Sequence, residues 1–197
     1  MQLRLIRNEV VMSNSIVDLV VLSVIARKKL TEKEIIKAAK DLARDYWNPT
    51  SDVICETVER LIIKNSLQVI QTRGGRVELL ITSIGMDQLS ALLLMFSCDE
   101  AEVGRGRLLE FIQLSSLDLI PDKVAVTIIQ RMLSRANSLL DDLKKQERFP
   151  NTGQKFIDVW LKADREDLTN RANILSEIAK TNLPANKGCH LEVGRYQ

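Results

Sequence analysis

The chain has 197 residues and a formal net charge of +2, because 28 Lys and Arg oppose 26 Asp and Glu. Hydrophobic residues make up 45% and charged residues 27%, with only 8 Gly and 4 Pro, which excludes a disordered, fibrous or strongly charged tail protein. Aromatic residues are only 4%, while Leu, Ile, Val and Ala are plentiful, so we expect a mostly α protein whose helices pack on helices.

The first predicted elements are two helices. Residues 1–14 have mixed charge and form an N-terminal extension, either an added arm or a frayed extension of the helix that follows. Residues 15–29 place apolar side chains at helical spacing and predict the first helix. Thr31 and Glu34 have the spacing of a capping box and predict a second helix. It should end shortly before Pro49, because proline disfavours helical geometry in the preceding residue.

A third helix is predicted to begin at Thr50 or Ser51, both good N-caps, and to end at Asn65. Its inward positions are expected to be the apolar residues at helical spacing, namely Val53, Ile54, Val58, Leu61 and Ile62.

Beyond Asn65 the sequence changes from a helical to a two-residue period. The segments 67–72 and 77–81 are rich in β-formers and are joined through Gly74 and Gly75, which predicts a β-hairpin. A fourth helix follows over 83–96. Three helices, a hairpin and a helix are the order of a winged helix-turn-helix domain, which we place at 15–96.

The region 105–182 is different in character. After the segment 107–119, it predicts a long amphipathic helix over 121–148 and a second long helix from Phe156. Such a hairpin leaves a wide apolar stripe that packs either on the fourth helix or on a second copy, and we favour a homodimer. The expected interface residues are Ile128, Met132, Leu139, Leu140, Leu143, Trp160, Leu161, Leu168 and Leu175. Residues 183–197 are expected to be a flexible tail.

Composition and motifs argue against membrane insertion and catalysis. The longest nearly apolar stretch, 10–26, is interrupted by Asn14 and Asp18, so we expect no membrane span. Glu9 lies among the N-terminal charges and no small-residue cleavage pattern follows the stretch, so we expect no signal peptide and a cytoplasmic protein. Three widely spaced cysteines match neither a disulfide framework nor a metal box, and His190 is the only histidine. We therefore expect no enzyme, no cofactor and no metal site.

Several ordered motifs resemble the PadR family of bacterial transcriptional regulators. They are the apolar helix 16–26, the LTEKEII run at 30–36, VERL at 58–61, the wing and its exit at 75–85, and Leu89. The motifs cover residues 15–93, and the helical layout extends the resemblance to 182. It implies a winged-helix dimer with a helical C-terminal dimerisation region. In drug-sensing relatives it also implies that interface aromatics hold flat ligands, although Trp160 is more simply explained by core or interface packing.

Two segments depart from the family pattern. Of the His-Gly-Tyr-Glu run that usually enters the second helix, only Glu34 and the following Ile35 remain. The Thr-Leu-Tyr-Pro segment of the recognition helix is replaced by Val-Ile-Cys-Glu at 53–56. A divergent member of this kind keeps the dimer and has either altered or lost the DNA readout.

The leading hypothesis is a dimeric, PadR-like transcriptional regulator that binds operator DNA through the third helix and the wing, with a small-molecule effector that modulates it. The candidate DNA-binding residues are Thr50, Ser51, Asp52, Cys55, Glu56, Lys64, Arg73, Gly74, Gly75 and Arg76. Residues 1–90 hold 13 basic and 11 acidic side chains, so there is no domain-wide basic surface, and the third helix is itself acidic. The alternative is therefore a winged-helix adaptor that binds protein and has lost the DNA readout.

Overall fold

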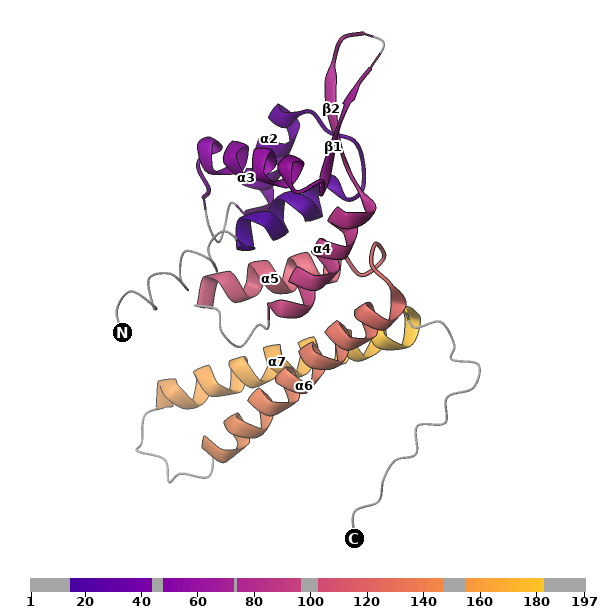
Figure 1. Cartoon of the computed structure of the whole chain (residues 1–197). Helices are drawn as coiled ribbons and strands as arrows, with labels where there is room; N and C mark the ends of the chain where they lie inside the picture. The colour runs from indigo at the N-terminus through magenta and orange to yellow at the C-terminus, as the bar shows by residue number, and fades with distance from the viewer. Residues whose placement is uncertain (1–14, 44–47, 73, 97–102, 147–154, 183–197) are drawn as a thin grey trace, which may run out of the picture. The chain divides into compact units, whose positions relative to one another are not determined.

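The computed structural model describes residues 15–43, 48–72, 74–96, 103–146 and 155–182 (Figure 1). The N-terminal extension and the C-terminal tail predicted from the sequence lie outside these residues. The chain divides into two units between Ile128 and Ile129, within a long helix. The predicted end of the winged-helix domain, residue 96, and the predicted start of the helical region, residue 105, both lie within the first unit.

The observed elements follow the predicted order, and their ends differ from the predicted ones by a few residues. In chain order they are an N-terminal helix at 15–25, α2 (Glu32–Ala43), α3 (Ser51–Ile63), β1 (Leu67–Gln71), β2 (Val77–Ile81), α4 (Ser83–Met95), α5 (Val103–Ser115), α6 (Asp122–Gln146) and α7 (Lys155–Asn182). The mostly α architecture with one β-hairpin is thus confirmed.

The core of the first unit is built around the N-terminal helix, whose side chains are buried almost all round, as expected for a central helix. Helix α3 packs Ile54, Val58 and Leu61 inward, as predicted, but the inward position predicted for Val53 is wrong because this side chain is exposed. Thr57 is buried in its place. The buried positions follow the spacing i, i+3, i+4 and i+7, and Val53 lies outside that stripe.

Helix α3 ends in a Schellman motif. Asn65 has a φ of 57°, in the left-handed region. Its N–H donates to the Ile62 carbonyl at 2.9 Å, and the Ser66 N–H donates to the Leu61 carbonyl at 2.8 Å. The predicted stop at Asn65 is confirmed, and the reversal sends the chain directly into β1.

Helix α4 begins against this same reversal. The Thr82 hydroxyl accepts from the Gly85 N–H at 3.1 Å as an N-cap, and it donates to the Asn65 carbonyl at 2.7 Å. Gly85 lies so close to the chain that a Cβ built on it would be 2.2 Å from the Ser66 carbonyl oxygen. Only glycine fits this approach without moving backbone.

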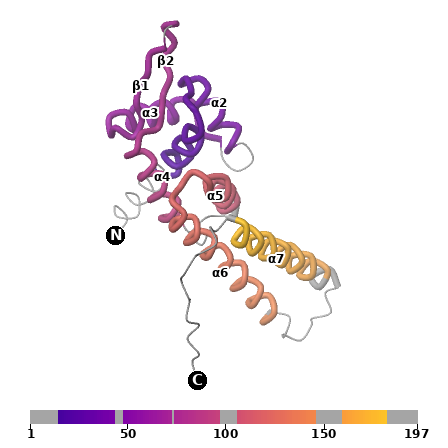
Figure 2. The backbone as a smooth tube through the Cα atoms, turned by 90° about the vertical axis from the view of Figure 1, so that its right-hand side faces the viewer, coloured from indigo at the N-terminus to yellow at the C-terminus, as the bar shows by residue number. Residues whose placement is uncertain are grey.

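Residues 67–81, here called the wing, form the antiparallel hairpin, with Leu67 opposite Ile81 and Gln71 opposite Val77. Leu30 forms an isolated antiparallel β-bridge with this hairpin, because its backbone exchanges two hydrogen bonds, of 3.2 and 2.8 Å, with the backbone of Leu79. Leu67 and Leu79 are buried at the base, and the distal half of the hairpin projects from the first unit (Figures 1 and 2).

In the second unit, the C-terminal part of α6 and α7 lie side by side as an antiparallel helical hairpin (Figures 1 and 2). Leu143, Leu168 and Leu175 are buried within the single chain. Among the described residues, no helix combines the length and the hydropathy that crossing a membrane requires.

The close approach at Gly85 generates a stability prediction. Gly85→Ala should lower the free energy of unfolding by about 2 kcal/mol or more, because the new methyl group meets a backbone carbonyl that cannot move independently. Gly74→Ala is the matched control, because a Cβ there meets nothing within 4 Å. Urea denaturation measures both variants, and equal stability of the two would contradict the proposed packing of α4.

Candidate nucleic-acid interface

The N-terminus of α3 is held by two polar contacts. Thr50 is the N-cap, and its hydroxyl accepts from the Val53 N–H at 3.4 Å. The Lys40 ammonium, on α2, donates to the Ser51 hydroxyl at 2.8 Å. The Lys40 contact holds the first turn of α3 against α2 in a helix-turn-helix. The roles seen for Thr50 and Ser51 are thus to cap and position the helix that they begin.

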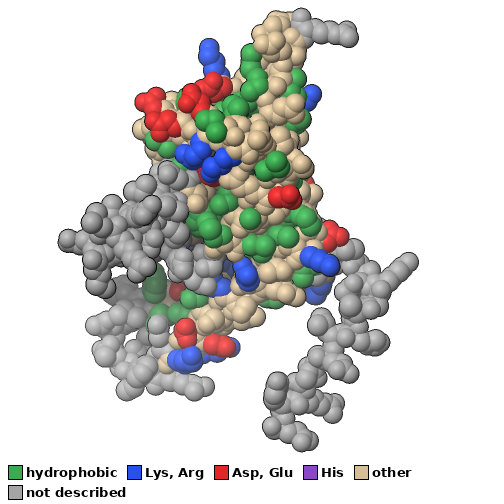
Figure 3. Space-filling view, viewed as in Figure 1, with side chains coloured by type: hydrophobic (Ala, Val, Ile, Leu, Met, Phe, Trp, Pro, Cys, Tyr) green, Lys and Arg blue, Asp and Glu red, His purple; other side chains and the backbone are tan. Residues whose placement is uncertain are grey.

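The outer face of α3 is acidic. Asp52, Glu56 and Glu59 are all exposed on it, and acidic side chains gather over α2 and α3 in the space-filling view (Figure 3). Between them lies Cys55, half-buried, whose thiol donates to Glu32. This hydrogen bond, together with partial burial and nearby carboxylates, raises the pKa of the thiol to about 11. Cys55 is therefore an uncharged thiol at neutral pH rather than a reactive thiolate.

The inner side of α3 carries a buried ion pair. Asp18, whose side chain is only 8% exposed, accepts a hydrogen bond from Arg60, which is 31% exposed. Arg60 also donates to the Thr57 hydroxyl at 3.1 Å, and Gln88 on α4 donates to the other Asp18 oxygen at 3.4 Å. Lys64, a candidate DNA-binding residue, lies 4.0 Å from the same carboxylate. A buried charge needs such partners, so this cluster orients α3 against the N-terminal helix and α4.

The tip of the wing is a short glycine turn. The Thr72 N–H donates to the Arg76 carbonyl and the Gly75 N–H to the Thr72 carbonyl, both at 2.9 Å. Gly75 has a φ of 73°, a conformation that side chains rarely adopt. Gly74 and Gly75 are exposed, with open space where a Cβ would stand. Arg73 lies outside the described residues.

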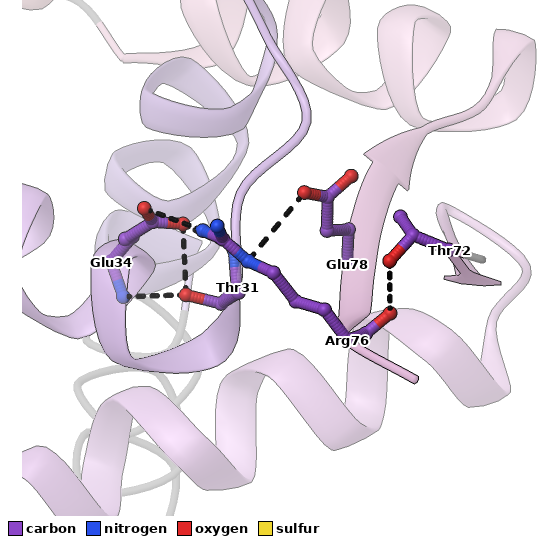
Figure 4. Close-up of polar contacts among 5 residues, drawn as sticks. All are labelled: Thr31, Glu34, Thr72, Arg76 and Glu78. Carbon is purple, nitrogen blue, oxygen red and sulfur yellow. Dashed lines mark hydrogen bonds and ion pairs between the residues drawn. The ribbon is translucent and has the colours of Figure 1, made fainter. Parts of the chain in front are cut away.

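Arg76 reaches from the wing to the start of α2 (Figure 4). Its guanidinium donates to Glu34 Oε1 at 2.8 Å, and its Nε lies 3.6 Å from Glu78 Oε1. The other Glu34 oxygen, Oε2, accepts from the Thr31 N–H and hydroxyl, each at 2.8 Å, which confirms the predicted capping box. The Arg76 charge is thus compensated by two carboxylates of the same chain.

The hydrogen bonds from Thr31 and then from Arg76 lower the pKa of Glu34 from 4.5 to about 2. Because the folded-state pKa is the lower one, the ionised Glu34 stabilises the fold above about pH 4.5, and this contribution is lost as the pH falls toward 2. The contact between the wing and α2 therefore persists throughout the neutral range.

The residues expected at a dimer interface fall into two groups. In the single chain Ile128, Met132, Leu143, Leu168 and Leu175 are already buried. Leu139 is 39% exposed and Trp160 is 65% exposed, while Leu140 and Leu161 are half-buried. Val159 and Ile174, which the sequence analysis did not include, are also exposed apolar side chains of α7.

Three positioning contacts were not foreseen from the sequence: Lys40 with Ser51, Asp18 with Arg60, and Glu34 with Arg76. The last two each join residues 42 positions apart, and no local spacing signals them. The one available signal was Asp18 itself, a carboxylate in the middle of an otherwise apolar helix, which implies a buried partner. Over the described residues, no three His, Cys, Asp or Glu side chains are grouped to hold a metal ion.

The helix-turn-helix of α2 and α3, followed by a hairpin bridged to the start of α2, defines a winged helix-turn-helix protein. No protein-family model matches the sequence, and no curated protein matches it.

Among solved structures, the chain is similar to regulators of the PadR family, the family that its motifs resemble. A PadR-like transcriptional regulator from Bacillus cereus is 16% identical, with 84% of this chain and 97% of that chain covered and a TM-score of 0.38. Bacillus subtilis PadR, in complex with operator DNA, is 16% identical, with 85% and 99% covered and a TM-score of 0.40. A Streptococcus mutans protein is 16% identical, with 83% and 98% covered and a TM-score of 0.37.

The Asp18–Arg60 pair predicts unequal effects for its two halves. Arg60→Ala should cost about 2–3 kcal/mol of unfolding free energy, because it leaves Asp18 buried with weaker partners. Asp18→Asn should cost only about 1 kcal/mol, since an amide still accepts from Arg60, which can also reach water. Urea denaturation of both variants compares them. An Asp18→Asn variant less stable than Arg60→Ala would show that the pair does not act as described.

Proposed function

We propose that this chain is a dimeric, cytoplasmic transcriptional regulator that binds operator DNA through α3 and the wing. The proposal rests on one observation: the first unit exposes α3 and the wing together and connects them. The outer face of α3 is exposed, the glycine turn of the wing is exposed, and the bridge from Leu30 to Leu79 ties the wing to the helix-turn-helix. To contact one DNA duplex at the same time, both elements must be held in a fixed orientation relative to each other.

In this proposal α3 reads base edges. The N-terminal residues of a recognition helix contact bases in the major groove, and here those residues are Ser51, Asp52, Cys55 and Glu56. Carboxylates at such positions accept from the amino group of cytosine and repel phosphates. We therefore expect the acidic face to weaken binding to random DNA. The affinity for the operator would then depend more strongly on base contacts.

Phosphate contacts would come from outside α3. The exposed backbone at Gly74 and Gly75 can approach the minor groove or the sugar-phosphate backbone. Arg73, which precedes them in the sequence, is the candidate side chain for a phosphate contact. The exposed lysines near the start of α2 are further candidates for backbone contacts: Lys28, Lys29, Lys33 and Lys37. Lys64, already near Asp18, is the least suited of the basic candidates.

The proposed dimer rests on the second unit. Val159, Trp160 and Ile174 expose apolar surface on α7, and Leu139 does so on α6. A second copy that covers this surface would supply the contact that a single chain lacks. A two-fold dimer places two copies of α3 on successive major-groove half-sites, and an effector bound near α6 and α7 would change affinity by altering their spacing.

The first experiment is fluorescence anisotropy of the full-length protein with its own upstream region and with a scrambled duplex at two salt concentrations. We expect salt-sensitive binding that prefers the upstream region. Arg73→Gln should weaken binding to both duplexes and reduce the slope of log affinity against log salt by about 0.9, the loss of one phosphate contact. Lys162→Gln, an exposed charge on α7, is the control. An unchanged slope for Arg73→Gln would remove this arginine from the interface.

The dimer has its own prediction. Trp160→Lys should convert dimers to monomers in sedimentation velocity, because an exposed indole would be replaced by a charge within the proposed contact. Asn173→Lys, at an exposed polar position of the same helix, is the matched control. Trp160 variants that remain dimeric with normal helix content would place the interface elsewhere.

A second candidate function is a winged-helix adaptor that binds a protein partner. The observation that favours it is the charge of α3, where Asp52, Glu56 and Glu59 are all exposed. These carboxylates repel phosphate and suit a basic protein surface. A confirmed dimer that binds neither duplex at low salt would favour the adaptor over the regulator.

A further inference from the structure

We propose that Arg76 is a positioning residue, which anchors the wing to the N-terminus of α2 and does not itself contact DNA. The DNA-binding half of this inference rests on the proposed function, whereas the anchoring half concerns the fold alone. It reassigns a residue that the sequence analysis placed among the DNA contacts.

The first support is the set of partners around the guanidinium. Glu34 Oε1 accepts from Arg76 at 2.8 Å, and Glu78 Oε1 lies 3.6 Å from its Nε (Figure 4). The three side chains together carry a net charge of −1. A phosphate that approached Arg76 would have to displace a carboxylate already bonded to it, while being repelled by both carboxylates. The local charge therefore disfavours a phosphate contact at this arginine.

The second support is the connection of both ends of this contact to the backbone. Glu34 is fixed by the capping box, because its other oxygen accepts twice from Thr31. Arg76 is fixed within the turn, because its carbonyl accepts from the Thr72 N–H at 2.9 Å and from the Thr72 hydroxyl at 3.1 Å. The ion pair thus joins the end of a helix to the turn of a hairpin.

The third support is the backbone bridge beside it. Leu30, the residue before Thr31, exchanges two hydrogen bonds with Leu79 on β2. The segment 30–34 therefore holds β2 and its turn at two points, Leu79 near the base and Arg76 nearer the tip. With the bridge alone, the distal half of the wing would be free to swing about Leu79. The ion pair prevents this movement and fixes the direction in which the glycine turn points.

The two roles for Arg76 predict opposite effects of removing its partner. If Arg76 contacts DNA, then Glu34→Gln releases it from a competitor and tightens binding. If Arg76 anchors the wing, Glu34→Gln loosens the wing and weakens binding. Glutamine still suits the capping-box position, so the start of α2 is preserved. Asp41→Asn is the matched control, because it removes one exposed carboxylate from the other end of α2.

The experiment applies amide hydrogen exchange to the full-length wild type, Glu34→Gln, Arg76→Gln, the double variant and Asp41→Asn. Anchoring predicts several-fold faster exchange at Thr72, Gly75 and Leu79 in both single variants, no further increase in the double variant, and wild-type exchange in Asp41→Asn. Circular dichroism should show unchanged helix content. Wild-type exchange of these amides in Arg76→Gln would overturn the anchoring role, whether or not the protein binds DNA.

Anisotropy with the upstream duplex then tests the second half of the inference. Both single variants should bind several-fold more weakly with an unchanged salt slope, and the double variant should be no weaker than either. Tighter binding of Glu34→Gln than of Asp41→Asn, or a slope reduced by about 0.9 in Arg76→Gln, would make Arg76 a DNA contact. If the wild type binds no duplex, the proposed function fails, while hydrogen exchange still decides the anchoring role.

Discussion

The buried carboxylate of Asp18 is the constraint on which the arrangement of the first unit depends. It lies in the central helix, where a charge without partners is costly, and Arg60 of α3 and Gln88 of α4 both donate to it. The apolar packing of Ile54, Val58 and Leu61 buries one stripe of α3, and the pairing of Arg60 with Asp18 adds a directional contact to it. The requirement to pair one buried charge selects a single position, and the face of α3 that remains exposed follows from it.

The elements that follow α3 are tied to the same position. The reversal at Asn65 starts β1 where α3 ends, and the backbone approach at Gly85 seats α4 on that reversal. The wing is then oriented by its own contacts with the residues before and at the start of α2. Together these contacts make the direction of the wing depend on the position of α3, which is the relation that a duplex spanning both elements would require.

The sequence predicts the local features of this fold well. The capping box of Thr31, the stop at Asn65 and the glycine turn each depend on a few neighbouring residues, so their spacing is sufficient. Val53 was misplaced because helical spacing defines an apolar face but not its rotation, which the pairing of Arg60 with Asp18 sets from 42 residues away. The contact of Arg76 with Glu34 could not be predicted for the same reason, since the two residues are equally distant in sequence.

For the C-terminal helices, the sequence alone does not identify which apolar residues are available for a dimer contact. Their periodicity predicts one apolar stripe, but it does not separate side chains that a single chain buries, such as Leu168 and Leu175, from those left exposed, such as Trp160. That separation depends on how α7 lies against α6, which is a property of the folded hairpin. The exposed apolar side chains are therefore the part of the stripe that is available for contact with a second copy.

In the proposed complex, two copies of α3 and of the wing read one operator. Hydroxyl-radical footprinting of the full-length protein on its own upstream region tests it most directly. We predict two protected segments related by an approximate dyad, with centres about 10–11 base pairs, or a small multiple of one helical turn, apart. The absence of protection at protein concentrations where the dimer is confirmed, or protection without two-fold symmetry, would contradict the account.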